Sequence, residues 1–481
     1  MSATDRHLFF LKEEEGKGKM KEKRGNFSGT IGFVMAAAGS AVGLGNIWRF
    51  PYLAAKGHGG VFILCYIVLA VTFGFALLTT EIAIGRKTAQ SPLTAYGVLH
   101  ARWKGLGILT CLVPTIILPY YCTIGAWVMK YFAIYLTGAG KEAVQENFFD
   151  GFISGNWEPI VWMFVFLFLT SFVVYRGINK GIEKYSKVLM PVLLVLVIGL
   201  AIYSMTISHT DANGVTRTGL QGVKVYLIPD FTSITVKEFF IILMDAMGQL
   251  FFSISVSMGI MIAYGSYVKK EVNLMKSINQ IEIFDTIVAL LAGLLIVPVV
   301  FTFMGVEGMS KGPGLMFVSL PKVFDAMGAI GSILGLLFFI MVIFAAITSA
   351  VSVMEAIVSS IMDAKHWSRH KSTLIVTAYA LIGSIVVCLG YNVFYFKLPL
   401  PNGTEGQILD IMDYISNNCL MPLVALLTCI LIGWVVKPKT VIDEVTQGVH
   451  PFHRRGLYIV MVKVIAPILL AVLLLQSFGI L

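Results

Sequence analysis

The sequence predicts an all-α membrane protein with 11 transmembrane helices. Of its 481 residues, 57% are hydrophobic and 13% are charged, whereas ordinary soluble domains carry roughly 25% charged residues. The apolar residues gather in runs of the length that crosses a bilayer, which takes about 20 residues. Two of these runs are interrupted by polar residues and glycines, and they lie at matching places in the two halves of the chain.

The individual helices follow from the apolar runs and from the residues that break them. In chain order, the predicted helices cover residues 28–55, 60–85, 106–136, 158–175, 186–207, 238–268, 277–305, 330–363, 372–391, 408–436 and 457–479. They divide the chain into an N-terminal tail (1–26), a first five-helix repeat (27–207), an outer loop (208–237), a second five-helix repeat (238–436), and a last loop with the eleventh helix (437–481).

Basic residues orient these helices in the membrane. About 25 of the 36 Lys and Arg residues fall in alternate connections, and cytoplasmic loops are the ones that collect Lys and Arg. We therefore expect a multi-pass protein of the plasma (cytoplasmic) membrane with its N-terminus cytoplasmic and, after 11 crossings, its C-terminus extracellular. The net charge of +9 is then explained by membrane topology, and we expect no nucleic acid partner.

The first helix contains a segment that is unsuited to a continuous membrane helix. Residues 36–52 read AAAGSAVGLGNIWRFPY, with three glycines, an asparagine, an arginine and a proline. Glycine is about 1 kcal/mol worse than alanine inside a helix. Irregular backbone at membrane depth is tolerated where it lines a cavity and where other groups satisfy its amides and carbonyls. The segment therefore predicts two half-helices whose ends point at a bound solute.

The sixth helix is interrupted in a similar way. Its middle carries Gln249, Ser253, Ser255, Ser257 and Gly259. Five helices separate the two interrupted segments, so helices 1–5 and 6–10 are candidate repeats, and an odd number of crossings gives the second repeat inverted topology. Such paired interruptions mark the midplane site of a secondary transporter.

Four motifs carry a resemblance to a known family. AGSAVGLGNIWRFPY, GQLFFSISVSMG, FAAITSA and LDIMDY together resemble the neurotransmitter:sodium symporter family, with its leucine-transporter-like fold, in the eleven-helix form found among bacterial members. The resemblance extends from Arg24 to the end of the tenth helix. It implies a sodium-coupled symporter that imports an amino acid by alternating access.

The resemblance implies two sodium ions, bound by oxygen atoms. The first site would use the Ala41 carbonyl, the Asn46 side chain, Ser253 and Asp285, and the substrate carboxylate would complete it. The second site would use the residues Gly39, Val42, Ala345, Thr348 and Ser349. Ser and Thr hydroxyls in membrane helices commonly bond back to the carbonyl one turn earlier, which is the alternative for Thr348 and Ser349.

Asp285 departs from the pattern of many family members, which carry asparagine at this place. Chloride-dependent members carry a serine one turn later, where this chain has Ala289, which cannot hold chloride. An ionisable residue inside a membrane helix is costly and is usually functional. We therefore expect the Asp285 carboxylate to supply the negative charge and transport to be independent of chloride.

The substrate site implied by the resemblance has no charged side chain. Its residues are Ala41, Leu44, Gly45, Ile117, Tyr121, Ile124, Phe252, Ser253, Ser255, Ser257, Met258, Ala350 and Val353. A charged substrate side chain would be desolvated there without a partner, so a neutral, mainly apolar amino acid is expected. Ser257, in place of a family glycine, leaves taurine, glycine or a GABA-like zwitterion open as the alternative.

The resemblance also implies two gating pairs, each on one side of the membrane. Arg49 would face Asp413 on the outside, and Arg24 would face Asp363 on the inside; the alternative is that each arginine merely extends to the interface. Glu81, in the second helix, is expected to accept hydrogen bonds from unwound amides and to serve as structural support.

Other classes of protein fit the sequence less well. A channel would need a pore-lining ring or a filter loop. The chain has no Ser-His-Asp grouping, His-rich metal motif or GxxxxGK[ST] loop, so we expect no enzymatic activity. The expected partners are a small amino acid and membrane lipid, and the expected oligomeric state is a monomer or a weak homodimer.

Overall fold

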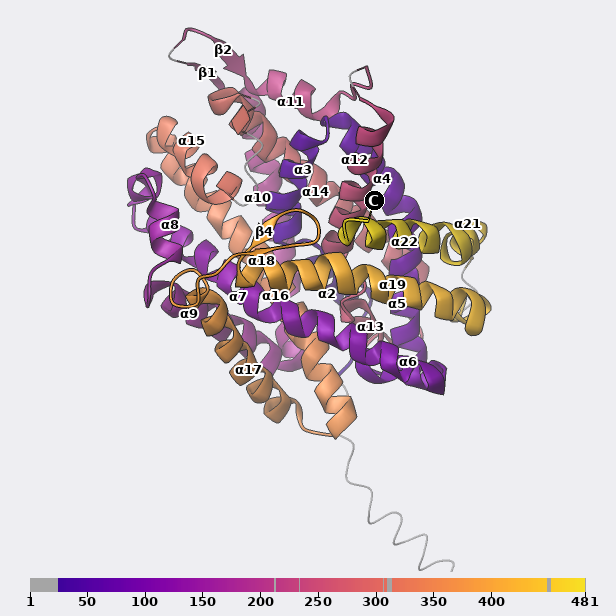
Figure 1. Cartoon of the computed structure of the whole chain (residues 1–481). Coiled ribbons are helices and arrows are strands. Elements are labelled where there is room, and N and C mark those ends of the chain that lie inside the picture. The colour runs from indigo at the N-terminus through magenta and orange to yellow at the C-terminus, as the bar shows by residue number, and fades with distance from the viewer. Residues whose placement is uncertain are drawn as a thin grey trace, which may run out of the picture.

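The computed structural model describes residues 25–211, 213–232, 234–305, 307–308, 314–447 and 451–480. These parts of the chain are almost wholly helical (Figure 1). Among them, 9 helices are long and apolar enough to cross a membrane, or up to 10 if the bent pair Thr30–Ala41 and Gly45–Lys56 is one span. The predicted all-α membrane fold is thus confirmed, and the count of 11 stays a prediction.

The first five spans are built mainly from long helices. The first is α2 (Thr30–Ala41) followed by the π-helical turn Gly45–Arg49 and α3 (Phe50–Lys56), and the second is α4 (Gly60–Leu69), the π-helical turn Ala70–Gly74 and α5 (Phe75–Thr88). The third to fifth are α7 (Lys104–Leu136), α9 (Glu158–Tyr175), and the π-helical turn Ile178–Glu183 with α10 (Lys184–Thr206).

The second half repeats this plan. The sixth predicted span consists of α12 (Val236–Ser253) and α13 (Ile260–Gly265), and it is followed by α14 (Leu274–Met304), α16 (Ala329–Lys365) and α17 (Arg369–Leu389). The tenth runs from α18 (Ile408–Asp413) through π-helical turns and α19 (Met421–Ile430) to Val435, and the last from α21 (Arg455–Val460) through a π-helical turn to α22 (Ala466–Ser477).

Shorter elements form the connections. The helices among them are α6 (Pro92–Leu99), α8 (Phe148–Ile153), α11 (Gly219–Leu227), α15 (Leu320–Ala326) and α20 (Lys439–Val445). Two 3-10 helices, Ala101–Trp103 and Gly140–Val144, and the π-helical turn Leu315–Ser319 also lie in the connections. Two small antiparallel pairs are formed by β1 (Ser208–Thr210) with β2 (Thr216–Thr218) and by β3 (Leu398–Pro399) with β4 (Glu405–Gly406). In β1–β2, Ser208 lies opposite Thr218.

Local sequence explains where α12 begins. The Thr235 side chain accepts a hydrogen bond from the Glu238 amide, and the Glu238 carboxylate accepts one from the Thr235 amide at 2.8 Å. This reciprocal capping box satisfies two amides that the first helical turn leaves without partners. The capping box of Thr235 and Glu238 therefore defines the residue at which α12 begins.

Glycines allow α5 and α13 to pack with their backbones in contact. A Cβ atom on Gly85 would lie 2.0 Å from the Ile262 carbonyl oxygen, and one on Gly265 would lie 2.4 Å from the Ile82 carbonyl oxygen. Any larger residue would collide with main chain that cannot rotate away. The short helix α13 is thus held directly against α5 of the second span.

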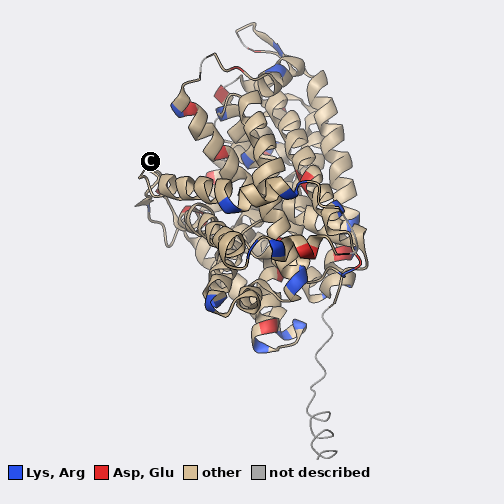
Figure 2. Ribbon diagram, turned by 90° about the vertical axis from the view of Figure 1, so that its right-hand side faces the viewer, with Lys and Arg blue, Asp and Glu red and all other residues tan. Residues whose placement is uncertain are grey.

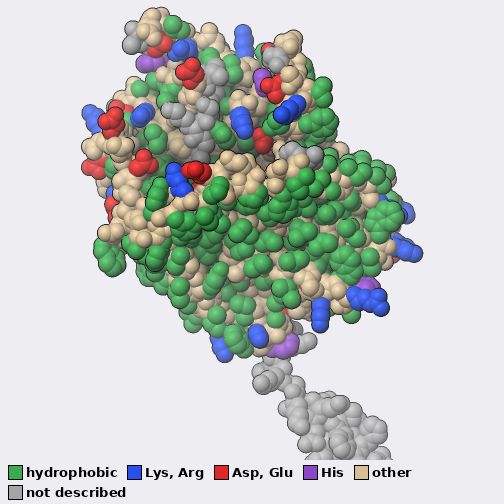
Figure 3. All heavy atoms as spheres, viewed as in Figure 1, with side chains coloured by type: hydrophobic (Ala, Val, Ile, Leu, Met, Phe, Trp, Pro, Cys, Tyr) green, Lys and Arg blue, Asp and Glu red, His purple; other side chains and the backbone are tan. Residues whose placement is uncertain are grey.

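The outer surface has the character expected of a membrane protein. On α9, the apolar side chains Val161, Phe164 and Phe168 are all more than half exposed. Figure 3 shows a broad band of apolar side chains, with charged side chains gathered on either side of it. In Figure 2 the long helices are mostly uncharged, and Lys, Arg, Asp and Glu lie mainly near helix ends and in connections.

Candidate sodium and substrate site

Both interrupted helices are broken at the predicted places. The first span bends by 51° between α2 and the helical segment that starts at Gly45. The sixth span leaves helical geometry after Ser253 and resumes at Ile260, and within this gap Ser255, Ser257 and Gly259 have positive φ values of 53°, 64° and 74°. The two breaks lie next to each other in the core of the protein. The hydroxyls of Ser40 in α2 and Ser255 are joined there by a hydrogen bond of 3.1 Å.

Three of the predicted sodium-site side chains come together at the breaks. The Asn46 amide nitrogen donates to Asp285 Oδ1 at 2.7 Å and to Ser253 Oγ at 2.9 Å. The Ser253 hydroxyl lies 2.8 and 2.9 Å from the two carboxylate oxygens of Asp285. All three residues are completely buried, so residues from the first, sixth and seventh spans form one closed polar cluster.

Tyr66 is a further member of this cluster that sequence reasoning missed. Its hydroxyl lies 3.0 Å from Ser253 Oγ and 3.2 Å from Asp285 Oδ2. Tyr66 and Asp285 are separated by 219 residues, and a tyrosine in an apolar run resembles any packing residue. The contact between the Tyr66 hydroxyl and the buried Asp285 carboxylate is formed only when the chain folds, so the sequence gives no sign of it.

Among the residues that the structure describes, no cationic side chain is paired with the carboxylate of this cluster. Asp285 is hydrogen-bonded by Asn46, Ser253 and Tyr66, and among the described residues no lysine, arginine or histidine forms an ion pair with it. A buried charge needs a partner of opposite sign to offset its desolvation. Carboxylate, hydroxyl and amide oxygens beside unwound backbone are the ligands that hard cations prefer. The arrangement can therefore bind a small cation.

The residues of the second predicted sodium site lie where α2 meets α16. The Ser349 hydroxyl donates to the Ser40 carbonyl at 3.1 Å and lies 3.5 Å from the Val42 carbonyl. The Thr348 hydroxyl instead bonds within its own helix, to the carbonyls of Phe344 at 2.8 Å and Ala345 at 3.1 Å. A Cβ on Gly39 would lie 3.4 Å from the Thr348 side chain. Ser349 thus reaches the break, while Thr348 shows the ordinary backbone contact of a membrane-helix threonine.

A small cavity of about 20 Å³ lies between the two breaks. Its lining contains seven of the predicted substrate residues, namely Ala41, Ile117, Tyr121, Phe252, Ser255, Met258 and Val353. It also contains Ser40, Gly43 and Ser349, of which none was predicted to contact substrate. The Tyr121 hydroxyl is buried here, and among the described residues no group meets it with good hydrogen-bond geometry. A polar group therefore remains available to a bound molecule.

A larger chamber of about 320 Å³ adjoins this cavity. Tyr121 and Phe252 line both spaces and therefore stand between them. Leu44 and Ile124, which were predicted to contact substrate, line the chamber. Its other walls are mainly aromatic, from Trp48, Tyr52, Tyr120, Trp127, Phe149 and Tyr391.

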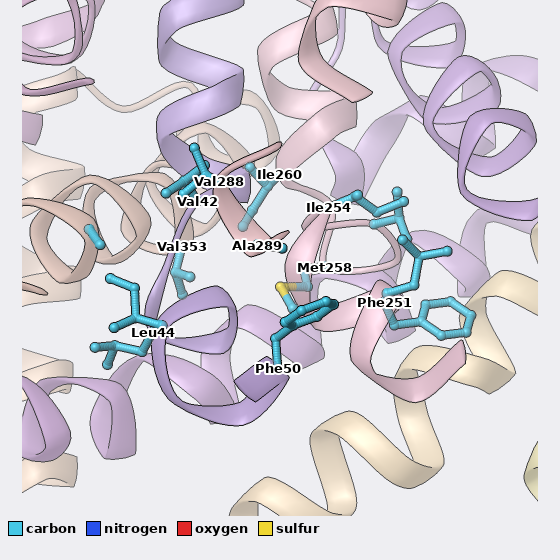
Figure 4. Close-up of a cluster of buried hydrophobic side chains, with 14 of the residues drawn as sticks. Val42, Leu44, Phe50, Phe251, Ile254, Met258, Ile260, Val288, Ala289 and Val353 are labelled. Carbon is cyan, nitrogen blue, oxygen red and sulfur yellow. The ribbon is translucent and has the colours of Figure 1, made fainter. Parts of the chain in front are cut away.

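Four predicted substrate residues line neither space: Gly45, Ser253, Ser257 and Ala350. The Ser257 amide donates to the Glu81 carboxylate at 2.6 Å, which is the support expected of Glu81. Gly45 lies against Phe252, because a Cβ there would be 2.4 Å from the phenylalanine ring. Figure 4 shows the apolar packing around the breaks, including Leu44, Met258 and Val353.

The predicted outer gate residues share the large chamber without forming an ion pair. Arg49 and Asp413 both line it, and Asp413 accepts hydrogen bonds from the Tyr120 hydroxyl at 3.1 Å and from the Asn417 amide at 2.5 Å. Of the inner pair, Arg24 lies outside the described residues. Its predicted partner Asp363 accepts a hydrogen bond from the Ser91 amide at 2.6 Å.

Comparisons with known proteins agree with this architecture. The model of the sodium:neurotransmitter symporter family matches residues 24–142 and 154–480. An uncharacterised sodium-dependent transporter of Bacillus subtilis is 33% identical over 96% of this chain and 99% of its own length. Another, from Methanocaldococcus jannaschii, is 32% identical over 86% of this chain and 82% of its own length.

A solved structure extends the likeness to three dimensions. The crystal structure of MhsT in complex with L-phenylalanine is 32% identical and superimposes with a TM-score of 0.82, covering 95% of this chain and all of MhsT. The family model thus covers most of the chain, and the fold agrees with that of a solved structure. The chain is therefore a transporter, not an enzyme, and it belongs to the sodium:neurotransmitter symporter family.

Proposed function

We propose that this protein is a symporter that uses sodium to import a neutral, mainly apolar amino acid by alternating access. The observation that carries the proposal is the buried cluster of Asn46, Ser253 and Asp285, whose negative charge has no cationic partner among the described residues. A sodium ion would supply that partner. A zwitterionic substrate would then place its carboxylate beside the ion and the Tyr121 hydroxyl.

The cavity lining supports an apolar side chain on the substrate. Ile117, Phe252, Met258 and Val353 line the cavity, and none of the described residues in its lining is charged. Methionine is flexible and fills space of varied shape, so aliphatic and aromatic substrates both suit this lining. The related MhsT has been solved with L-phenylalanine. Ser257, which kept smaller zwitterions open, does not line the cavity, and this favours the apolar substrate.

Two sodium ions and independence from chloride belong to the same proposal. The contact of Ser349 with the carbonyls of Ser40 and Val42 supports a second ion at the junction of α2 and α16. Ala289, one turn after Asp285 on α14, is fully buried and offers no polar atom from its side chain. The fixed charge of Asp285 would make a bound anion unnecessary.

The large chamber supports alternating access from the side of Arg49 and Asp413. We infer that this side is extracellular, because Arg49 follows the break of the first span and so lies at the opposite end of that span from the basic N-terminal sequence, which is expected to be cytoplasmic. The gate residues would close over the chamber once substrate is bound. The arrangement of the inner gate and the orientation of both termini are part of this proposal, as is a monomer or weak homodimer.

Uptake into proteoliposomes tests the proposal. With sodium outside, labelled L-phenylalanine, L-leucine, glycine, taurine, GABA and L-glutamate are compared, and choline replaces sodium in the control. We expect sodium-dependent uptake of the apolar amino acids and counterflow when unlabelled substrate is loaded inside. Uptake of taurine, glycine or GABA alone would support the alternative substrate class. Equal uptake in sodium and choline would contradict the proposal.

A further inference from the structure

Arg454, which precedes the last span, reaches into the contact between the second and seventh spans. Its guanidinium group donates to both carboxylate oxygens of Glu282, at 3.1 and 2.8 Å, and to Asn279 Oδ1 at 2.5 Å, and these two residues belong to α14. It also donates to the Val71 carbonyl at 3.2 Å and lies 3.5 Å from the centre of the Phe75 ring, both in the second span.

These contacts lie close to the candidate sodium site along both helices. Glu282 is one turn before Asp285 on α14, and residues at that spacing share a helix face. Val71 lies in the π-helical turn Ala70–Gly74 of the second span, a little over one turn after Tyr66. The Tyr66 hydroxyl and the Asp285 carboxylate meet at 3.2 Å. Arg454 therefore bridges the same two helices that meet at the sodium site.

Arginine is suited to this bridge for a geometric reason. Its planar guanidinium presents five N–H donors in a fixed fork, so it can hold a carboxylate, an amide oxygen and a main-chain carbonyl at once. A lysine ammonium is a single point on a flexible stem and lacks that fork. Glu282 is 7% exposed at its side chain and Arg454 is 29% exposed, so the contact is largely shielded from solvent.

We propose that Arg454 is a positioning residue for the first sodium site. By clamping the second span to the seventh, it keeps the Tyr66 hydroxyl and the Asp285 carboxylate within hydrogen-bond distance, and so raises the affinity of the site for sodium. This inference rests on the proposed function, and it gives the last span a part in ion binding that no motif in the sequence suggests.

A sodium titration of the purified full chain tests this role with sodium itself as the probe. A ligand that binds only the folded state stabilises it by RT ln(1 + L/Kd), where L is the free ligand concentration. The half-saturating sodium concentration is therefore obtained by fitting this dependence to the melting temperatures measured in sodium–choline mixtures. The variant is Arg454→Lys, which keeps the charge and loses the fork. The matched control is Arg455→Lys, at a neighbouring exposed arginine.

We expect Arg454→Lys to raise the half-saturating sodium concentration at least about threefold, as degraded hydrogen bonds would, and Arg455→Lys to leave it unchanged. Glu282→Gln should raise it similarly, and the double variant Arg454→Lys/Glu282→Gln should add little further. Arg454→Lys could instead lower the melting temperature in choline and leave the half-saturating sodium concentration unchanged. That result would show a structural role alone and overturn the inference. If the wild-type chain shows no stabilisation by sodium, or if Asp285→Asn leaves the titration unchanged, the proposed function fails instead.

Discussion

In the proposed first sodium site, Asp285 would supply the charge that attracts the ion. Unit charges about 4 Å apart attract by about 4 kcal/mol at an effective dielectric constant of about 20. Because about 1.36 kcal/mol corresponds to a factor of ten, Asp285→Asn should raise the half-saturating sodium concentration for substrate uptake at least about tenfold. Asp443→Asn, at an exposed position of α20, is the control. A variant with wild-type sodium dependence would remove Asp285 from the site.

Tyr66 contributes a hydroxyl to the same carboxylate. Tyr66→Phe removes the contacts at 3.0 Å to Ser253 and 3.2 Å to Asp285 while keeping the ring. A hydrogen bond to a charged group contributes about 1.5–3 kcal/mol, so we expect a loss of sodium affinity of about tenfold or more. Sodium-dependent substrate uptake measures it, with Tyr395→Phe, at an exposed position in the connection after α17, as the matched substitution. Equal effects of the two variants would contradict a specific role for Tyr66.

Single residues were predictable from sequence where they stand out against their surroundings. Asn46 and Asp285 are polar residues in apolar runs, and such residues have few reasons to be there. Tyr66 and Arg454 give no such signal, because a tyrosine in a helix and an arginine in a basic connection between helices are ordinary. Their contacts join residues far apart in sequence, and the partner of each is decided by packing.

At the level of elements, the contact between α5 and α13 should be intolerant of any added atom. In Gly265→Ala the new Cβ would lie 2.4 Å from the Ile82 carbonyl oxygen, and overpacking of this kind destabilises by about 1–3 kcal/mol. We expect a lower melting temperature in detergent. Gly199→Ala, which meets nothing within 4 Å on α10, should leave the melting temperature unchanged or raise it slightly. Equal melting temperatures would mean that α13 is free to move away from α5.

The elements themselves were predicted with uneven success. The breaks in the first and sixth spans were predictable, because glycine and serine clusters at membrane depth are poor helix material. The length of α13 was not, since its six residues are held by contact with the second span and their own sequence continues an apolar run. The short helices α8, α11 and α15 in the connections were also missed, because short amphipathic segments leave weak patterns.

At the scale of the whole molecule, transport should be indifferent to chloride. The charge that chloride would contribute is covalently present at Asp285, and Ala289 offers no ligand for an anion. Chloride is replaced by gluconate on both sides of the membrane at constant sodium. The initial rate of sodium-driven uptake should stay within about twofold of the rate in chloride, because a larger change would correspond to the loss of at least one hydrogen bond. Uptake that disappears in gluconate would show that an anion site exists elsewhere in the protein.

The number of sodium ions per cycle determines how far a membrane potential can concentrate the substrate. Moving one elementary charge through about 100 mV is worth about 2.3 kcal/mol. With equal sodium on both sides and a valinomycin-clamped potential of about 100 mV, two ions carried with a zwitterion supply about 4.6 kcal/mol, and one ion half of that. Because about 1.4 kcal/mol is a factor of ten, the limiting accumulation ratio is over a thousandfold for two ions and about fiftyfold for one. In the proposed mechanism the ions of both sites are released on the same side of the membrane as the substrate, so we expect the steeper dependence on potential. The accumulation ratio is measured at steady state for several clamped potentials. If it rises with potential as expected for one transported ion, one of the two sites does not contribute a transported charge.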